Sequence, residues 1–276
     1  MTLVAEAQTA PDAIEASVNY VLPTGGVIYN FSGGPGSTKT ETNIQSDPRR
    51  VTIRNGRLAR EKFDLDKQGF KLVDHETRVR DFFDAEELRR VYYPEMIELV
   101  KAQTGARRAI VFDHTLRTAD DDKREALKIR EVVRRVHNDY TEWSARQRVR
   151  DVLPEEADAL IAGRFAVVQV WRSISWPVET HPLALCDAGS VAPEDLIVAE
   201  RRYPGRVGQT YSVAANPAHA WTWFPRMARD EALVFKVYDS ATDRARFVPH
   251  TAFDDPTTPA NARPRESIEI RTFAFF

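Results

Sequence analysis

The chain has 276 residues, of which 42% are hydrophobic and 29% are charged, and its formal net charge is −2. This balance is typical of a globular protein and gives no general attraction to nucleic acid or to an anionic membrane. Because Cys186 is the single cysteine, an internal disulfide and a cysteine-based metal cluster are both excluded, and a reducing cytoplasm is the expected location.

The first third of the chain predicts short strands and loops. Residues 1–14 are expected to form a flexible tail, without the basic and apolar regions of a secretory signal. Residues 17–24 (SVNYVLPT) predict a strand, and residues 31–48 are rich in Gly, Ser, Thr and Pro and predict a long loop that could serve as a lid. Asn55-Gly56 is a typical hairpin turn.

The stretch from 84 to 105 is the clearest helix. Asp84 is a suitable N-cap, Glu87 completes a capping box, and Gly105 is suited to the C-terminal end. Pro94 is expected to interrupt or kink this helix, because proline lacks the amide hydrogen that a helix interior needs.

The next segments alternate in type. Residues 107–117 predict a strand, and residues 118–125 (TADDDKRE) predict a polar loop. A helix capped by Thr141 is expected from 142 to about 153, followed by a further helix over 154–163.

Residues after 163 form short runs rich in Val, Ile and aromatics, broken by Gly, Pro, Asn and Asp, which is typical of an antiparallel barrel or jelly roll. The predicted fold class is α+β, mainly β, with a jelly-roll core (a double-stranded β-helix) and supporting helices. No linker divides the chain, so a single domain over 1–276 is expected, with N-terminal strands and the lid loop over 15–84 and the helices and jelly-roll core over 85–276.

The stretch RVHNDYT (135–141) holds a candidate metal-binding pair. On a strand, His137 and Asp139 would face the same side and Asn138 the other. Two His and one carboxylate are the ligands of many Fe(II) centres, yet one such pair alone is about what chance gives. His250, at the end of the strand-like run RFVPHTAF, is the preferred third ligand. The competitor His114 cannot chelate together with the adjacent Asp113, and a structural role is favoured for it.

The last strand carries a candidate anion clamp. Arg265 and Ser267 share a face of the strand, and an arginine with a hydroxyl can bind a carboxylate. Arg271 has the same parity and is the alternative clamp. Taken singly, these arginines are more readily explained as surface charges on an edge strand.

Together, HxD (137–139), His250 and RxS (265–267) resemble the Fe(II)/2-oxoglutarate-dependent oxygenases. More narrowly, the chain is similar to the CmcJ/NvfI-like hydroxylases and desaturases. The similarity covers roughly residues 85–276, and the stretches that carry it include VFDHTLR (111–117), RVHNDYT (135–141), RFVPHTAFDDP (246–256) and RESIEIRTFAFF (265–276).

The resemblance implies a jelly-roll core with Fe(II) bound by His137, Asp139 and His250. It also implies 2-oxoglutarate as a cosubstrate on the metal, with its distal carboxylate on Arg265 and Ser267, and O2 as the oxidant. The expected reaction is hydroxylation, desaturation or a related oxidation of a small natural-product-like metabolite, including endoperoxide formation. The alternatives are a different metal-dependent enzyme on a cupin-like barrel and an inactive binding protein of the same fold.

Weaker assignments complete the prediction. Tyr140 is a less favoured cosubstrate contact, and Arg172 is expected to pair with Asp187 or Asp239. Cys186 should be a small buried residue. No nucleic-acid or membrane partner is expected, and a homodimer is compatible with the sequence. An aromatic cluster is a candidate substrate surface, although core packing is the commoner role; its members are Trp221, Trp223 and Phe224.

Overall fold

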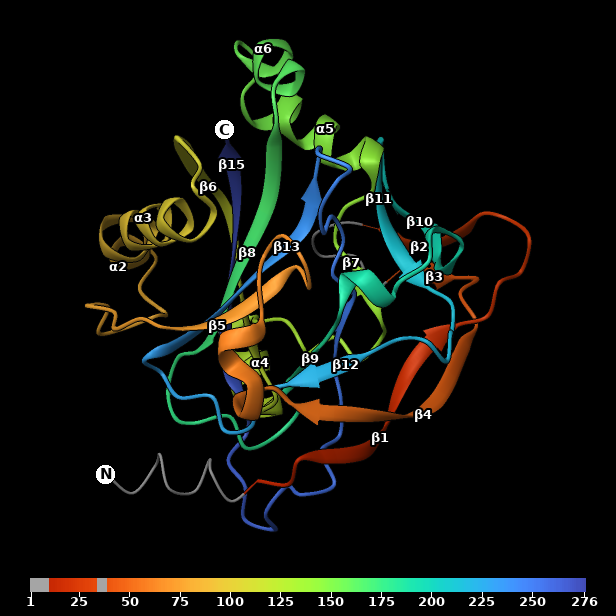
Figure 1. Cartoon of the computed structure of the whole chain (residues 1–276), viewed down its shortest axis with the longest axis vertical. Coiled ribbons are helices and arrows are strands. Elements are labelled where there is room, and N and C mark those ends of the chain that lie inside the picture. The colour runs from red at the N-terminus through yellow and green to blue at the C-terminus, as the bar shows by residue number, and fades with distance from the viewer. Residues whose placement is uncertain (1–9, 34–38) are drawn as a thin grey trace.

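The structure of the chain is a computed structural model that describes residues 10–33 and 39–276 (Figure 1). Over these residues the protein is mainly β, with two sheets and a few helices. The larger sheet is mixed, and its strand order is β1 (Ala13–Val21), β4 (Ser46–Asn55), β12 (Trp221–Trp223), β9 (Leu183–Cys186), β14 (His250–Ala252), β7 (His137–Asn138), β11 (Arg206–Val213), β10 (Leu196–Tyr203), β2 (Ile28–Ser32) and β3 (Thr40–Thr42).

The smaller sheet is antiparallel throughout and forms the most buried part of the molecule. Its strand order is β5 (Phe70–Asp74), β13 (Glu231–Asp239), β8 (Phe165–Ser173), β15 (Glu266–Phe275) and β6 (Arg108–Thr118). Every residue of the three central strands is buried, because one face meets the larger sheet and helices cover the other. Polar residues in these strands therefore need partners inside the protein.

The predicted helix over 84–105 is confirmed, although it is not regular. It consists of α2 (Ala85–Glu87), a π-helical segment η2 (Leu88–Tyr92) and α3 (Tyr93–Thr104). The Asp84 carboxylate accepts hydrogen bonds from the first backbone amides, and Gly105 ends the helix with a φ of 73°. Pro94 is the second residue of α3 and follows the π-helical segment directly, so the helix is irregular where proline lacks an amide donor. The helix packs beside β6 and β15 (Figure 1).

The core between the two sheets is built from side chains of both, including Leu72, Phe235 and Phe273 of the smaller sheet and Leu183 and Leu185 of the larger. At one end of this core lie α5 (Glu142–Val152) and α6 (Ala157–Ala162) (Figure 1). The predicted N-cap of α5 is confirmed, since Thr141 forms a reciprocal capping box with Ser144.

The N-terminal third contains more strand than the sequence predicts. β1 begins at Ala13, within the predicted tail, because Ile14 already alternates inward with the following apolar residues. The predicted loop over 31–48 includes the end of β2, all of β3 and the start of β4. Residues 1–9 and 34–38 lie outside the described residues, and so does the centre of the predicted lid.

The hairpin predicted at Asn55-Gly56 is wrong. Asn55 ends β4 and caps the 3₁₀ helix η1 (Gly56–Lys62) by accepting a hydrogen bond from the Arg57 amide. Gly56 is required for packing, because a Cβ there would meet the Phe224 ring at 2.6 Å and Thr222 at 2.7 Å. The backbone conformation at Asn55-Gly56 is therefore set by the close approach of Thr222 and Phe224. Turn propensities of a dipeptide do not take such long-range contacts into account.

The polar loop predicted over 118–125 is largely helical. The carboxylate of Asp120 accepts from the Lys123 amide and starts α4 (Asp121–Leu127), and Lys128 ends it in the left-handed conformation. A helix without an apolar face was not recognised from its composition. The described residues also contain the short helices η3 (Ala188–Ser190) and η4 (Pro193–Asp195). No helix in the described part of the chain is long and apolar enough to cross a membrane.

Candidate metal centre and its cavity

Two neighbouring strands of the larger sheet bring the predicted ligands together. β7 and β14 pair antiparallel, with His250 directly opposite His137, and the two imidazole rings lie 4.4 Å apart between centroids. Asp139 follows β7. One ligand atom from each of the three residues lies within 4.8 Å of the others, and this is the one such group of three or more found among the described residues. The predicted HxD and distal histidine therefore form one cluster.

Backbone contacts hold each imidazole in the tautomer that a metal needs. His137 Nδ1 lies 2.8 Å from the carbonyl oxygen of Arg135, and His250 Nδ1 lies 3.0 Å from that of Val248. Each Nδ1–H can donate to its carbonyl, which leaves Nε2 with the lone pair. His250 Nε2 is buried and has no hydrogen-bond partner among the described residues. Burial, and then His137, lower the pKa of His250 to about 4, so its ring is neutral and able to coordinate.

Asp139 is held ionised by its neighbours. Burial alone would raise its pKa, but Arg271 and His137 hold that pKa well below the usual value. Its Oδ2 accepts hydrogen bonds from Gln169 Nε2 at 2.6 Å and from Arg271 Nε at 3.0 Å. Oδ1 remains on the side of the histidines, 3.4 Å from His137 Nε2. One carboxylate oxygen is thus fixed by the protein and the other is directed towards a metal position.

Arg271 is committed to structural ion pairs and does not form a free clamp. Besides Asp139, it donates to Asp113 at 3.2 Å, to Thr115 at 2.9 Å and to Glu269. These carboxylates outweigh the effect of burial and raise the pKa of Arg271 above its usual value. The guanidinium therefore remains charged and orients Asp139.

Arg265 lies beside the histidines, and both it and Ser267, two residues further on in β15, have unused donors among the described residues. A cavity of about 20 Å³ is bounded by both histidines, Trp171, Arg265 and Glu269, among others. Arg265 is fully buried and donates through Nη1 to the carbonyl oxygen of His181, while its Nε has no partner among the described residues. Ser267 Oγ is likewise buried without a partner. Orphaned donors of this kind can bind an anionic group such as a carboxylate.

A second cavity, of about 600 Å³, opens over His137 and Asp139. Its walls come from β6, β10, β11 and α5, and it includes Tyr140. Burial is the main reason that the pKa of Tyr140 is raised, so its hydroxyl is neutral. This cavity is large enough for a small organic molecule above the metal position.

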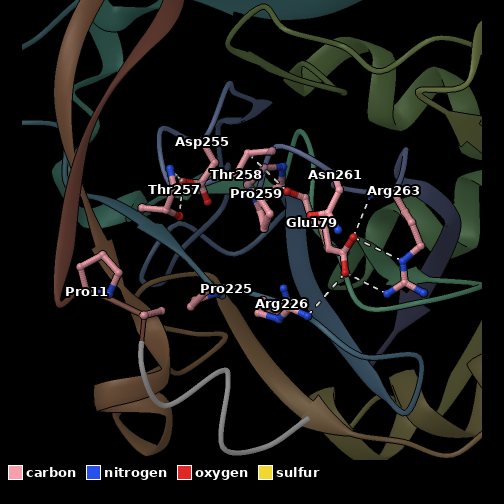
Figure 2. A pocket seen from close by; sticks show the side chains of 13 residues that line it. Pro11, Glu179, Pro225, Arg226, Asp255, Thr257, Thr258, Pro259, Asn261 and Arg263 are labelled. Atoms are coloured by element: carbon pink, nitrogen blue, oxygen red, sulfur yellow. Dashed lines mark hydrogen bonds and ion pairs between the residues drawn. The ribbon is translucent and has the colours of Figure 1, made fainter. Parts of the chain in front are cut away.

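A larger cavity, of about 690 Å³, lies elsewhere and holds no histidine or cysteine among its described lining residues. Figure 2 shows Glu179 between Arg226 and Arg263, with its carboxylate bonded to both. Three of its charged groups therefore pair with one another, and none of the predicted metal ligands lines it.

The tryptophans predicted to contact substrate lie on the wrong face of the sheet. On β12, Trp221 and Trp223 stand opposite Cys186 and Ala184 of β9. His250 stands opposite Leu185, whose side chain points to the other face. Both tryptophans are buried in a separate core with Cys186, and Phe224 packs against Phe63 and Phe70 between the sheets. None of the three lines a cavity beside the metal ligands, so the core interpretation replaces the substrate prediction.

Other sequence-based assignments have mixed outcomes. His114 lies 2.6 Å from the Tyr93 hydroxyl and outside the ligand cluster, as a structural histidine would. The predicted ion pair of Arg172 is wrong: its guanidinium contacts His75 and a backbone carbonyl instead. Cys186 is buried as predicted, and burial raises the pKa of its thiol to about 12. Asn138 bonds to three backbone groups and does not line the cavity.

Sequence reasoning missed the residues that support the ligands. Gln169 lies in the middle of the apolar run FAVVQV, and a polar residue inside a fully buried strand was an available signal. Glu269 shares strand parity with Arg265 and Arg271, so its position on the same face could also have been inferred. Arg117 lines both cavities, but only the pairing of β6 with β15 places it opposite Ser267.

The chain resembles known proteins over nearly its whole length. A family model described as "Oxidoreductase/YMDC permease-like domain" matches residues 18–275. The hydroxylase/desaturase efuI of Hormonema carpetanum is 33% identical, over 95% of each chain. The hydroxylase/desaturase CTB9 of Cercospora beticola is 35% identical, over 91% of this chain and 82% of its own.

A solved structure agrees with these sequence matches. The iron and alpha-ketoglutarate-dependent endoperoxidase NvfI superimposes with a TM-score of 0.86 at 28% identity, over 96% of this chain and 99% of that one. The Fe(II)/2-oxoglutarate-dependent dioxygenase nvfI of Aspergillus novofumigatus is also 29% identical over 95% of this chain. The chain belongs to the family of Fe(II)/2-oxoglutarate-dependent hydroxylases and desaturases related to efuI, CTB9 and NvfI.

Proposed function

We propose that the protein is a mononuclear Fe(II)/2-oxoglutarate-dependent dioxygenase that oxidises a small natural-product-like metabolite. In this proposal the two sheets form a double-stranded β-helix, or jelly-roll, core within a single domain. The observation that carries the proposal is the His137, Asp139 and His250 cluster, whose ligand atoms lie within 4.8 Å of one another beside the 600 Å³ cavity. Two imidazoles and one carboxylate leave further coordination positions open, as oxygen activation requires.

The donor set supports each assigned role. His137, Asp139 and His250 would hold Fe(II), with Gln169 and Arg271 orienting the aspartate. Arg265 and Ser267 would bind the distal carboxylate of 2-oxoglutarate, since both carry buried donors without partners. When bound, Fe(II) and 2-oxoglutarate together reduce O2, and decarboxylation of the cosubstrate to succinate is coupled to oxidation of a substrate C–H bond.

The chain's own residues supply position and shielding. The buried surroundings of Arg265 keep bulk water from its guanidinium, which would strengthen its interaction with an anion. The relatives are named as hydroxylases, desaturases and an endoperoxidase, and all of these outcomes are compatible with one metal centre. A cytoplasmic location and a homodimeric state remain proposals from the sequence.

Succinate formation tests this function. The Fe(II)-loaded protein with 2-oxoglutarate and O2 should form succinate and consume O2, even slowly without substrate, and His137→Ala should abolish both. His114→Gln is the matched control, because this histidine lies outside the cluster. A tightly bound metal without succinate would favour a different cupin-like metal enzyme. No metal binding at all would favour an inactive binding protein.

A further inference from the structure

The cavity over the metal position carries a strong excess of positive charge. Seven arginines line it against three aspartates, and no lysine or glutamate is present among its described lining residues, so its formal charge is +4 (7 − 3). The whole chain, by contrast, carries −2. A doubly positive Fe(II) and a doubly negative 2-oxoglutarate would cancel each other and leave this excess unchanged.

Most of these arginines have no acidic partner in the described part of the chain. Arg271 makes ion pairs, but the other six have no carboxylate within 4.0 Å among the described residues; they are Arg117, Arg130, Arg135, Arg148, Arg201 and Arg206. Their sequence neighbours behave differently. Arg202 pairs with Glu200 at 2.7 Å, and Arg134 lies 3.5 Å from Asp254. In these two stretches, the arginines that line the cavity are thus the ones without an acidic partner among the described residues.

Strand geometry directs these side chains towards one space. Arg135 and His137 are two residues apart and both line the cavity. On the neighbouring β10–β11 hairpin, Arg201 stands opposite Gly208 and Tyr203 opposite Arg206, and all four line the same cavity. Like charges gathered in a concave site reinforce one another's field and raise the local concentration of anions.

The same cavity also exposes apolar surface. Trp143 on α5, Tyr203 on β10 and Val207 on β11 are 48%, 36% and 49% exposed and all line it. Large apolar side chains left exposed around a cavity mark a binding surface for an apolar body. The cavity thus combines a cationic wall with an apolar rim.

We propose that the substrate is an amphipathic anion, a small molecule whose carboxylate, sulfate or phosphate binds the Arg135, Arg201 and Arg206 side chains while its apolar body contacts Trp143, Tyr203 and Val207. This inference rests on the proposed oxygenase function and names the substrate class of the same site. The arginines hold the anionic end, and the remaining part of the molecule lies over the metal position.

Two fluorescent probes with the same ring system test the proposal. 8-Anilinonaphthalene-1-sulfonate carries a sulfonate, and N-phenyl-1-naphthylamine lacks it. Binding of each is measured without O2, with Fe(II) and saturating 2-oxoglutarate, for the wild type, Arg201→Gln, Arg206→Gln and the double variant. Arg202→Gln is the matched control, since this arginine is already paired with Glu200. 2-Oxoglutarate affinity is titrated in parallel for every variant.

We expect the sulfonate to bind the wild type at least about tenfold more tightly than the neutral probe. Arg201→Gln and Arg206→Gln should each raise the dissociation constant of the sulfonate probe about threefold to tenfold. Arg202→Gln should change that constant less than about twofold. In all variants, the dissociation constants of the neutral probe and of 2-oxoglutarate should also change less than about twofold. Equal binding of the two probes, or equal effects of Arg201→Gln and Arg202→Gln, would overturn the proposal. If the variants weaken 2-oxoglutarate binding instead, the arginines bind the cosubstrate, and this result would also overturn the proposal.

The experiment separates this inference from the proposed function. If the Fe(II) protein fails to bind 2-oxoglutarate, the oxygenase function fails, and the substrate inference fails with it whatever the probes show. If 2-oxoglutarate binds normally while the two probes bind alike, only the substrate class is wrong.

Discussion

Replacement of Arg271 by glutamine should destabilise the metal-free protein by about 3–5 kcal/mol. This guanidinium is buried and bonded to Asp139 and Glu269, which are themselves buried, and to the half-exposed Asp113. Removing one partner of a buried ion pair leaves an uncompensated charge, and that loss sets the size of the effect. Asp113 adds little, because water screens an exposed pair.

A control and a double variant make the prediction quantitative. Arg108 forms a similar forked contact with Glu156, but the two side chains are 43% and 50% exposed, so Arg108→Gln should lower the free energy of unfolding far less than Arg271→Gln does. Adding Glu269→Gln to Arg271→Gln removes one of the stranded carboxylates and should recover about 1–3 kcal/mol.

Urea unfolding followed by fluorescence gives all of these values, with metal removed by a chelator. Two results would refute this prediction. In the first, Arg271→Gln lowers the free energy of unfolding no more than Arg108→Gln does. In the second, the double variant loses as much free energy of unfolding as Arg271→Gln and Glu269→Gln lose together. Either result would mean that Arg271 does not compensate the buried acids.

Further predictions concern the cosubstrate, the thiol and a buried histidine. Arg265→Ala should raise the 2-oxoglutarate concentration for half-saturation at least about tenfold, because it removes charged hydrogen bonds; if Arg271→Ala alone does so, the clamp is assigned to the wrong arginine. Cys186 should not react with a thiol reagent at pH 8 in the folded protein, since its pKa is raised to about 12, and should react fully in urea; rapid native labelling would contradict its burial. Burial is the main influence on the pKa of His219 and lowers it, so the unfolded chain binds that proton first as the pH falls below about 6.5. Stability should therefore decline as the pH falls below about 6.5, and His219→Gln should reduce this decline; an unchanged slope would exclude His219 as its source.

The sequence predicts best where a local rule determines the outcome. Period-two alternation placed His137 and Asp139 together, and capping chemistry identified the helix after Asp84 and the one after Thr141. These features depend on neighbours a few residues away. The distant His250 was also placed correctly beside His137. That prediction relied on the order of several motifs along the chain, which resembles a known family, and not on the spacing of one motif.

The sequence fails where partners come from distant strands. Gln169 and Arg271 meet Asp139 only because β8 and β15 lie side by side, and no local rule states this. Trp221 and Trp223 were misplaced because the face of β12 is decided by its pairing with β9. The Asn55-Gly56 turn was likewise overridden by the packing of Phe224 on the glycine.

The most direct test of the account is the absorption spectrum of the protein with Fe(II) and 2-oxoglutarate in the absence of O2. We predict a weak visible charge-transfer band that saturates at one Fe(II) and one 2-oxoglutarate per chain, and that His137→Ala, Asp139→Ala and His250→Ala each lack. A protein that binds Fe(II) at these residues but develops no band on addition of 2-oxoglutarate would contradict the assignment of the site.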